Sequence, residues 1–241
     1  MFIFEIQMRK KVAQSLTKSN DKILWRGTET QRIEAFSDSV FAFALTLLVV
    51  SLEVPKTFSQ LKDILGGFVA FGISFLLLFQ VWYYQNLFFR RFGLKDIKTI
   101  VLNGALLFTV LFYVYPLKFL FSLFLFSTDA AAISPHEVPL LMLVYGIGFC
   151  AIFGLFALMY RNAAKQADII GLSKAELFAT HTQQQVFVWY FIIGVFTVVC
   201  AFIVPQKFSG ATGMLYGLVG LAESIISSRR GKLAAKKFPA K

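Results

Sequence analysis

Apolar residues in this chain gather into six long runs separated by short polar segments. The runs cover residues 34–54, 63–89, 97–126, 138–160, 184–204 and 209–228, with boundaries good to a few positions. Each is close to the roughly 20 apolar residues that an α-helix needs to cross a bilayer. None alternates polar and apolar positions as the strands of a membrane barrel do. The pattern therefore predicts an all-α membrane protein with six transmembrane helices.

Composition supports a membrane as the surroundings of this chain. Hydrophobic residues make up 57% of the sequence and charged residues 15%, against about a quarter charged in soluble domains. The first residues, "MFIFEIQMRKK", contain too short an apolar run for a cleavable signal peptide. We therefore expect an N-terminal segment at 1–30, a membrane domain at 31–228 and a basic tail at 229–241.

The positive charge is unevenly distributed between the two sets of loops. Twenty of the 24 Lys and Arg lie in the N-terminal segment, the second and fourth connections and the C-terminal tail, whereas the opposite loops hold only Lys56, Lys62 and Lys207. The positive-inside rule then predicts that both termini are cytoplasmic, in an inner or plasma membrane. Because the net charge of +11 is spread over four segments, it does not require nucleic acid. The charge of the tail is consistent with a topology signal in a solvated segment, and contact with anionic membrane lipid is the alternative.

Motifs of membrane enzymes and of ATP-driven pumps are missing from the sequence. There is no metal-ligand spacing, nucleophile motif or P-loop, so we expect neither an enzyme nor a bound cofactor or metal. Two strings, "VYGIGF" at 144–149 and "LYGLVG" at 215–220, resemble the "TVGYG" filter of potassium channels. Both lie inside long apolar runs with no short pore helix before them. We therefore interpret their glycines as sites of close helix packing.

Polar side chains inside the first three runs need partners. Asp38 would cost about 2.5–3.5 kcal/mol at the centre of a spanning helix. Trp82, Gln85 and Asn86 lie together in the second run, and Asn103 lies early in the third. Each of these alone is consistent with an ordinary hydrogen bond between helices. Because all lie toward the same end of the three spans, they predict one shared polar network.

The first run has two distinct faces. At about 100° per residue, one narrow stripe carries large apolar residues and a threonine, while Ser37 and Asp38 point elsewhere. The stripe consists of Ser39, Phe43, Thr46, Leu47 and Val50. On this geometry the stripe is either a packing face or, with several copies around a symmetry axis, the lining of a pore.

The string "RIEAFSD" at 32–38, followed by "SVFAFALTLLVVSLEVP", resembles the signature of the transmembrane protein 175 family of endolysosomal and prokaryotic potassium channels. The signature residues are Arg32, Phe36, Ser37 and Asp38. Trp82 with Gln85 and Asn86 resembles the tryptophan pattern of that family's second helix, although its histidines are replaced here. Asn103 resembles an asparagine early in the third helix.

This resemblance implies a channel with permeant potassium and no filter loop. It places apolar constriction rings at Phe43, Leu47 and Val50 and a potassium-preferring threonine at Thr46. The first ring is Ile or Leu in the family, so Phe43 is a departure. Short prokaryotic members form tetramers, which implies a homotetramer here.

The signature itself is expected to act as a structural lock. Ser37 and Asp38 would bond to the second and third spans, and Arg32 would tie down the entrance of the first helix. This lock would aim the stripe at the axis. A proton-coupled transporter that uses Asp38 as the carrier remains the alternative, and a membrane scaffold is a third possibility.

Overall fold

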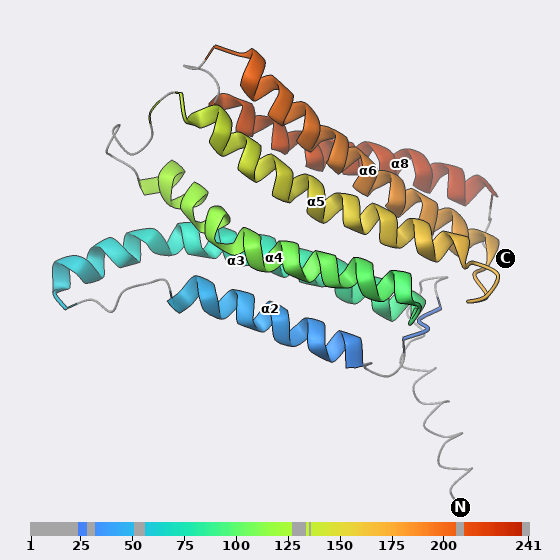
Figure 1. Ribbon diagram of the computed structural model, residues 1–241. Coiled ribbons are helices and arrows are strands. Elements are labelled where there is room, and N and C mark those ends of the chain that lie inside the picture. Colours follow the sequence, from blue (N-terminus) through green and yellow to red (C-terminus); the bar gives the residue numbers. More distant parts are fainter. Residues whose placement is uncertain are drawn as a thin grey trace, which may run out of the picture.

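The chain folds into a bundle of helices (Figure 1). The computed structural model describes residues 24–27, 32–50, 56–126, 134, 136–205 and 210–237, and among these it contains no strand. The described helices are α2 (Arg32–Val50), α3 (Phe58–Phe92), α4 (Ile97–Phe126), α5 (Val138–Lys165), α6 (Lys174–Ile203), the 3₁₀ helix η1 (Gly210–Gly217) and α8 (Leu218–Lys237). Six α-helices within the described residues confirm the predicted all-α fold class.

Three of the described helices are long and apolar enough to cross a membrane by length and composition. They are Ile97–Leu117 within α4, α5 and α6. The sixth predicted span, 209–228, has a different form: it begins as η1 and continues as α8, which extends to Lys237. Part of the predicted basic tail, residues 229–237, is therefore helical. The sequence hides this boundary because helix formation continues through the basic residues, which themselves favour helix.

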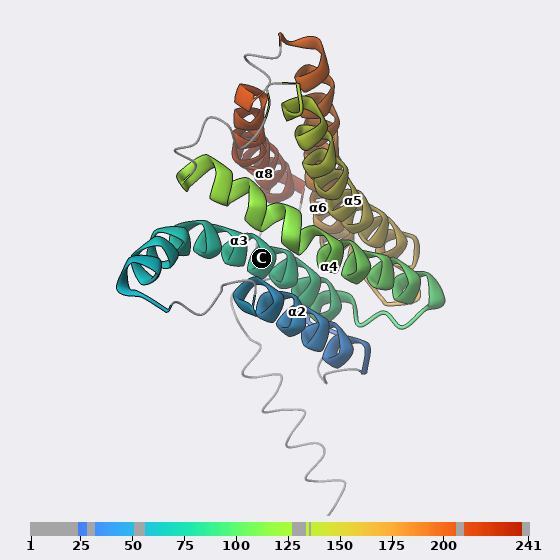
Figure 2. The same cartoon turned by 60° about the vertical axis from the view of Figure 1, so that its left-hand side comes forward.

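The helices pack in two groups that meet along α4 and α5. In one group, α6 packs against α5, η1 and α8. In the other, α4 packs against α2 and α3, and it also contacts α5. Among the described elements, α2 contacts only α3 and α4. Figures 1 and 2 show α2 at one edge of the bundle, with α6 and α8 at the opposite edge. Among the described elements, one side of α2 is therefore left without a neighbour.

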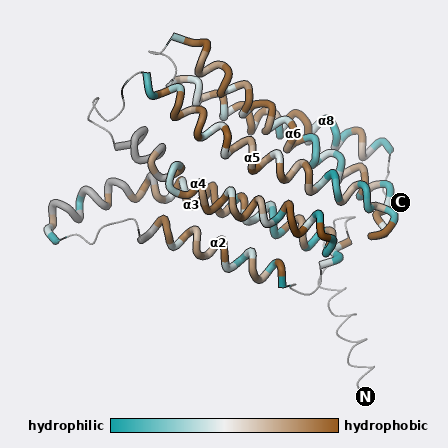
Figure 3. Tube along the Cα trace, in the orientation of Figure 1, coloured by the Kyte–Doolittle hydropathy of each residue, from teal (hydrophilic) through white to brown (hydrophobic). Residues whose placement is uncertain are grey.

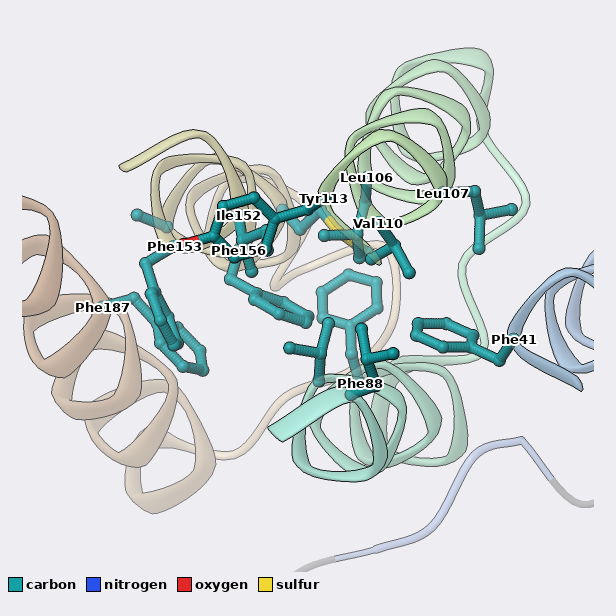
Figure 4. Packing of buried hydrophobic residues seen from close by; sticks show 14 of the residues in the cluster. Phe41, Phe88, Leu106, Leu107, Val110, Tyr113, Ile152, Phe153, Phe156 and Phe187 are labelled. Carbon is teal, nitrogen blue, oxygen red and sulfur yellow. The ribbon is translucent and has the colours of Figure 1, made fainter. Parts of the chain in front are cut away.

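Aromatic side chains fill the interior where the two groups meet (Figure 4). Phe187 of α6 stacks on Phe156 of α5 with ring centroids 5.1 Å apart, and Tyr160 meets Phe88 of α3 at 5.4 Å. Inside a bilayer such contacts stabilise the bundle mainly through close packing, since lipid tails are as apolar as the side chains. The core therefore fixes how α3, α5 and α6 sit against one another.

The first of the two glycine strings is a packing site on α5. A Cβ at Gly148 would lie 2.2 Å from the ring of Tyr113, and one at Gly146 would lie 1.9 Å from Val198. The Tyr113 hydroxyl also donates to the carbonyl of Tyr145 at 2.9 Å. For the second string the interpretation is wrong, because a Cβ at Gly217 or Gly220 would meet open space.

Candidate functional site on helix α2

The inward side of α2 is built for packing against α3 and α4. Ser37, Phe41, Ala44 and Leu48 recur at spacings of three and four residues, and all four are buried. Such spacing places them on one side of the helix. Figure 4 shows Phe41 pointing from α2 toward Phe88 and the α4 side chains.

The opposite side of α2 is uncovered. Phe36 and Phe43 are 62% and 57% exposed, and Ser39 and Thr46 are also exposed. We call these four residues the α2 outer face. Leu47 is half-buried at its margin, and the side chain of Val50 lies outside the described residues. Most of the predicted stripe thus lies on the side of α2 that no other described helix contacts.

Hydroxyl groups on the α2 outer face are bonded to the helix backbone. Thr46 Oγ1 donates to the carbonyl of Ala42 or of Phe43, at 2.9 and 2.7 Å, and Ser39 Oγ donates to the carbonyl of Ala35. A hydroxyl that donates its hydrogen in this way keeps lone pairs on its oxygen. Thr46 therefore presents an oxygen acceptor among apolar groups.

A chain of buried hydrogen bonds joins α2 to α3 and α4. Asn103 Nδ2 on α4 donates to Ser37 Oγ at 2.9 Å, and Gln85 Nε2 on α3 donates to Asn103 Oδ1 at 3.1 Å. Ser37 Oγ in turn donates to the carbonyl of Ile33 at 2.7 Å. Ser37, Gln85 and Asn103 are all buried. These bonds fix one rotation of α2 about its own axis, because turning it would break them inside an apolar core.

A second link holds the flank of α2. The indole Nε1 of Trp82 on α3 donates to Asp38 Oδ1 at 2.7 Å. The carboxylate thus has a partner and turns away from the α2 outer face. Among the described residues, Arg32 and Asn86 have no hydrogen-bond partner, and Phe36 points outward. The structure therefore brings together five of the eight predicted network residues.

Residues 24–27, just before α2, form a clamp that the sequence did not reveal. Both terminal nitrogens of Arg26 bond to Glu176 at the start of α6, at 2.8 and 3.0 Å, and Arg26 Nε donates to the carbonyl of Ile170. The backbone N–H groups of Arg26 and Gly27 donate to the carbonyl of Arg90 at the end of α3. A Cβ at Gly27 would lie 2.7 Å from the Phe89 carbonyl oxygen, so this close approach requires glycine.

The clamp brings three basic segments together at one end of the bundle. It joins the N-terminal segment, the basic end of α3 and the α5–α6 connection. The pattern "SKAE" at 173–176 does predict the capping box that begins α6, in which Ser173 and Glu176 bond to each other's backbone N–H groups. Nothing in the sequence indicates that Glu176 also receives Arg26, since 150 residues separate the two.

Comparison with known proteins decides the family. A family model described as "Endosomal/lysosomal potassium channel TMEM175" matches residues 32–113, the region that contains α2, α3 and the polar network. A potassium channel of Marivirga tractuosa is 39% identical over 183 residues, which cover 71% of this chain and 74% of the relative. The chain belongs to the TMEM175 family.

Other relatives agree with this membership. A potassium channel of Chamaesiphon minutus is 32% identical over 157 residues, covering 62% of this chain and 72% of the relative. The crystal structure of a variant of the potassium channel MtTMEM175, in complex with a nanobody–MBP fusion protein, matches with a TM-score of 0.79 and 33% identity. The match covers 89% of this chain and 99% of that one. The chain is accordingly an integral membrane protein and a potassium channel of the TMEM175 type, not an enzyme.

Proposed function

We propose that four copies of this chain surround a common axis and that the α2 outer face lines a potassium-permeable pore along it. The observation that carries the proposal is the contrast between the two sides of α2. Its inward side is bonded to α3 and α4, while Phe43 and Thr46 on the other side are exposed and no described helix covers them. Uncovered apolar area on a membrane helix faces lipid, a sister subunit or a pore wall. The resemblance of residues 32–55 to the TMEM175 signature supports the pore wall for α2.

In this proposal the constriction is apolar. Rings of Phe43, Leu47 and Val50 would succeed one another along the axis, one helical turn apart, and a narrow apolar ring excludes water until it widens. An ion that passes has to shed part of its hydration shell. Potassium holds this shell less tightly than sodium and so crosses at lower cost.

In this proposal, the Thr46 oxygen contacts the permeating ion and gives the preference for potassium over sodium. Its hydrogen is donated to the backbone, so its oxygen lone pairs are available to replace part of the lost hydration. Four such oxygens among apolar rings give a modest preference for potassium. The four Phe43 rings narrow the pore more than Ile or Leu would, so we expect a low conductance.

The clamp and the polar network are assigned the role of setting the rotation of α2. We further propose that both termini lie on the cytoplasmic side of an inner or plasma membrane. This orientation agrees with the three basic segments that lie together at one end of the bundle. The proton-coupled transporter is less well supported, because Asp38 is held by Trp82 and points away from the α2 outer face.

The proposal is tested by ion flux through the full chain in liposomes. Phe43→Ala widens the constriction, and we expect potassium flux to rise by about tenfold, which corresponds to a barrier about 1.4 kcal/mol lower. Thr46→Val removes the oxygen but keeps the shape, so the potassium-to-sodium ratio should fall while flux persists.

The matched control for Phe43→Ala is Phe202→Ala on α6. Phe202 is equally exposed, at 57%, but lies on a helix that does not contact α2. Phe41→Ala is unsuitable because Phe41 is buried, and its truncation would cost about 3–5 kcal/mol. Equal effects of Phe43→Ala and Phe202→Ala, or a flux that requires a proton gradient, would contradict the proposal.

A further inference from the structure

A polar pocket lies between the first turns of α6 and the last turns of α8, far from α2. It has a volume of about 550 Å³. Its lining includes Phe178, His181, Gln184, Gln185, Trp189 and Arg230, and no lining residue is acidic. We call it the α6–α8 pocket. None of its lining residues belongs to the proposed pore or to the polar network.

Arg230 is held in place within this pocket. Its guanidinium lies 5.0 Å from the centre of the Phe178 ring, and its Nη2 donates to Gln185 Oε1. A guanidinium has five N–H donors, so several stay available after this one bond. Arg230 is therefore a half-buried, oriented cation with spare donors, which is the arrangement that binds phosphate well.

Charge around the pocket is strongly positive. Helix α8 carries Arg229, Arg230, Lys232, Lys236 and Lys237, and the sequence has no acidic residue after Glu223. Glu223 itself accepts a hydrogen bond from Tyr190 at 2.5 Å, and Glu176 is paired with Arg26. Neither acid lines the pocket, so no carboxylate of the described residues neutralises this positive charge there.

The pocket also lies where the surface changes from polar to apolar. Figure 3 shows hydrophilic residues at the ends of α6 and α8 near the C label and hydrophobic residues along the rest of α6. Trp189 lines the pocket and is 50% exposed, and beyond it α6 exposes Ile192, Val195 and Phe196. An exposed tryptophan at such a boundary is typical of the membrane–water interface.

We propose that the α6–α8 pocket binds the phosphate head group of an anionic membrane lipid. Arg230 receives the phosphate, His181 and Gln184 add polar contacts, and Trp189 packs against the glycerol and upper acyl chain. If α2 lines the axis, as proposed above, α6 and α8 lie at the perimeter of the assembly, where lipid is present. The binding itself does not depend on ion flux, so it can fail or hold separately from the pore.

The test measures lipid retained by the purified full-length protein in a neutral detergent, by native mass spectrometry. Phosphatidylglycerol should bind and phosphatidylcholine should not. Arg230→Gln should weaken phosphatidylglycerol binding by about tenfold, the loss expected for one charge-assisted phosphate contact. Arg229→Gln is the matched control, because it removes the same charge one residue away, at an exposed position outside the pocket lining.

Three results would overturn the proposal. Equal loss in Arg230→Gln and Arg229→Gln would mean attraction by net charge alone. Phosphatidylcholine has the same phosphate but is neutral overall because of its choline group, so its equal retention would mean that the net negative charge of the lipid is not recognised. Displacement of the lipid by millimolar inorganic phosphate would mean a site for free anions. Arg230→Lys keeps the positive charge but not the planar guanidinium, so it should bind phosphatidylglycerol with intermediate affinity. It also serves as a control for a folding defect in Arg230→Gln.

Discussion

At the scale of single residues, Asn103 does most to join the first three helices. It lies on α4, donates to Ser37 on α2 and accepts from Gln85 on α3. Replacing it with leucine keeps its approximate volume but leaves Gln85 without its acceptor in an apolar core. We expect Asn103→Leu to destabilise the protein by about 1–3 kcal/mol and to lower its thermal unfolding midpoint in detergent by several degrees.

Asn86→Leu is the control for this change. Asn86 is half-buried on α3 and has no hydrogen-bond partner among the described residues. Its substitution should leave the midpoint nearly unchanged. If the two leucine variants unfold at the same temperature, the network does not hold α2 in place.

The sequence could predict much of this network, because polar side chains in apolar helices need hydrogen-bond partners and Ser37, Gln85 and Asn103 lie toward the same end of the three predicted spans. It could not predict which atoms would pair. Asn86 is only one position beyond Gln85, yet one step along a helix turns a side chain by about 100°. Gln85 therefore reaches Asn103, whereas Asn86 has no partner among the described residues.

At the scale of elements, the start of α4 is held by a polar cap. Thr99 donates to Asp96 through its backbone N–H at 3.2 Å and its hydroxyl at 2.6 Å, and Asn162 of α5 donates to Asp96 at 3.0 Å. Burial alone would raise the pKa of Asp96, but these hydrogen bonds outweigh it and hold the pKa at about 2. The cap therefore fixes both the start of α4 and its register against α5.

This cap predicts a pH-dependent stability. Because the folded pKa lies below the ordinary value of 3.8, the charged carboxylate stabilises the fold above pH 4, and this contribution is lost as the pH falls toward 2. The carboxylate is partly exposed, so we expect Asp96→Ala to cost about 1 kcal/mol at pH 7. The difference from wild type should shrink between pH 4 and 2 when unfolding is followed in detergent.

Asp168→Ala, at an exposed position in the α5–α6 connection, is the matched control and should change stability little at any pH. A cost for Asp96→Ala that stays constant down to pH 2 would contradict the assigned pKa. The pattern "DIKT" at 96–99, just before an apolar run, is a helix-start signal that the sequence does carry. The contribution of Asn162 is visible only in three dimensions.

At the scale of the whole molecule, hydropathy predicted the six α-helices found among the described residues, because the backbone of each apolar run has to form its hydrogen bonds within a helix in lipid. It did not predict how the runs end. Helix α3 begins at Phe58, α5 and α8 continue into basic segments, and η1 replaces the start of the sixth span. The clamp of Arg26 on Glu176 was also hidden, because an ion pair between distant segments leaves no periodic pattern.

If the proposed function is right, the α2 outer face lines an ion path along an axis shared by identical subunits. The most direct measurement is the effect of a positively charged, water-soluble thiol reagent on potassium flux through Phe43→Cys, with Cys150 and Cys200 replaced by alanine. We predict that labelling stops the flux, and that Phe202→Cys in the same background is unaffected. Flux that continues after Phe43→Cys is fully labelled would show that this face of α2 does not line the pore.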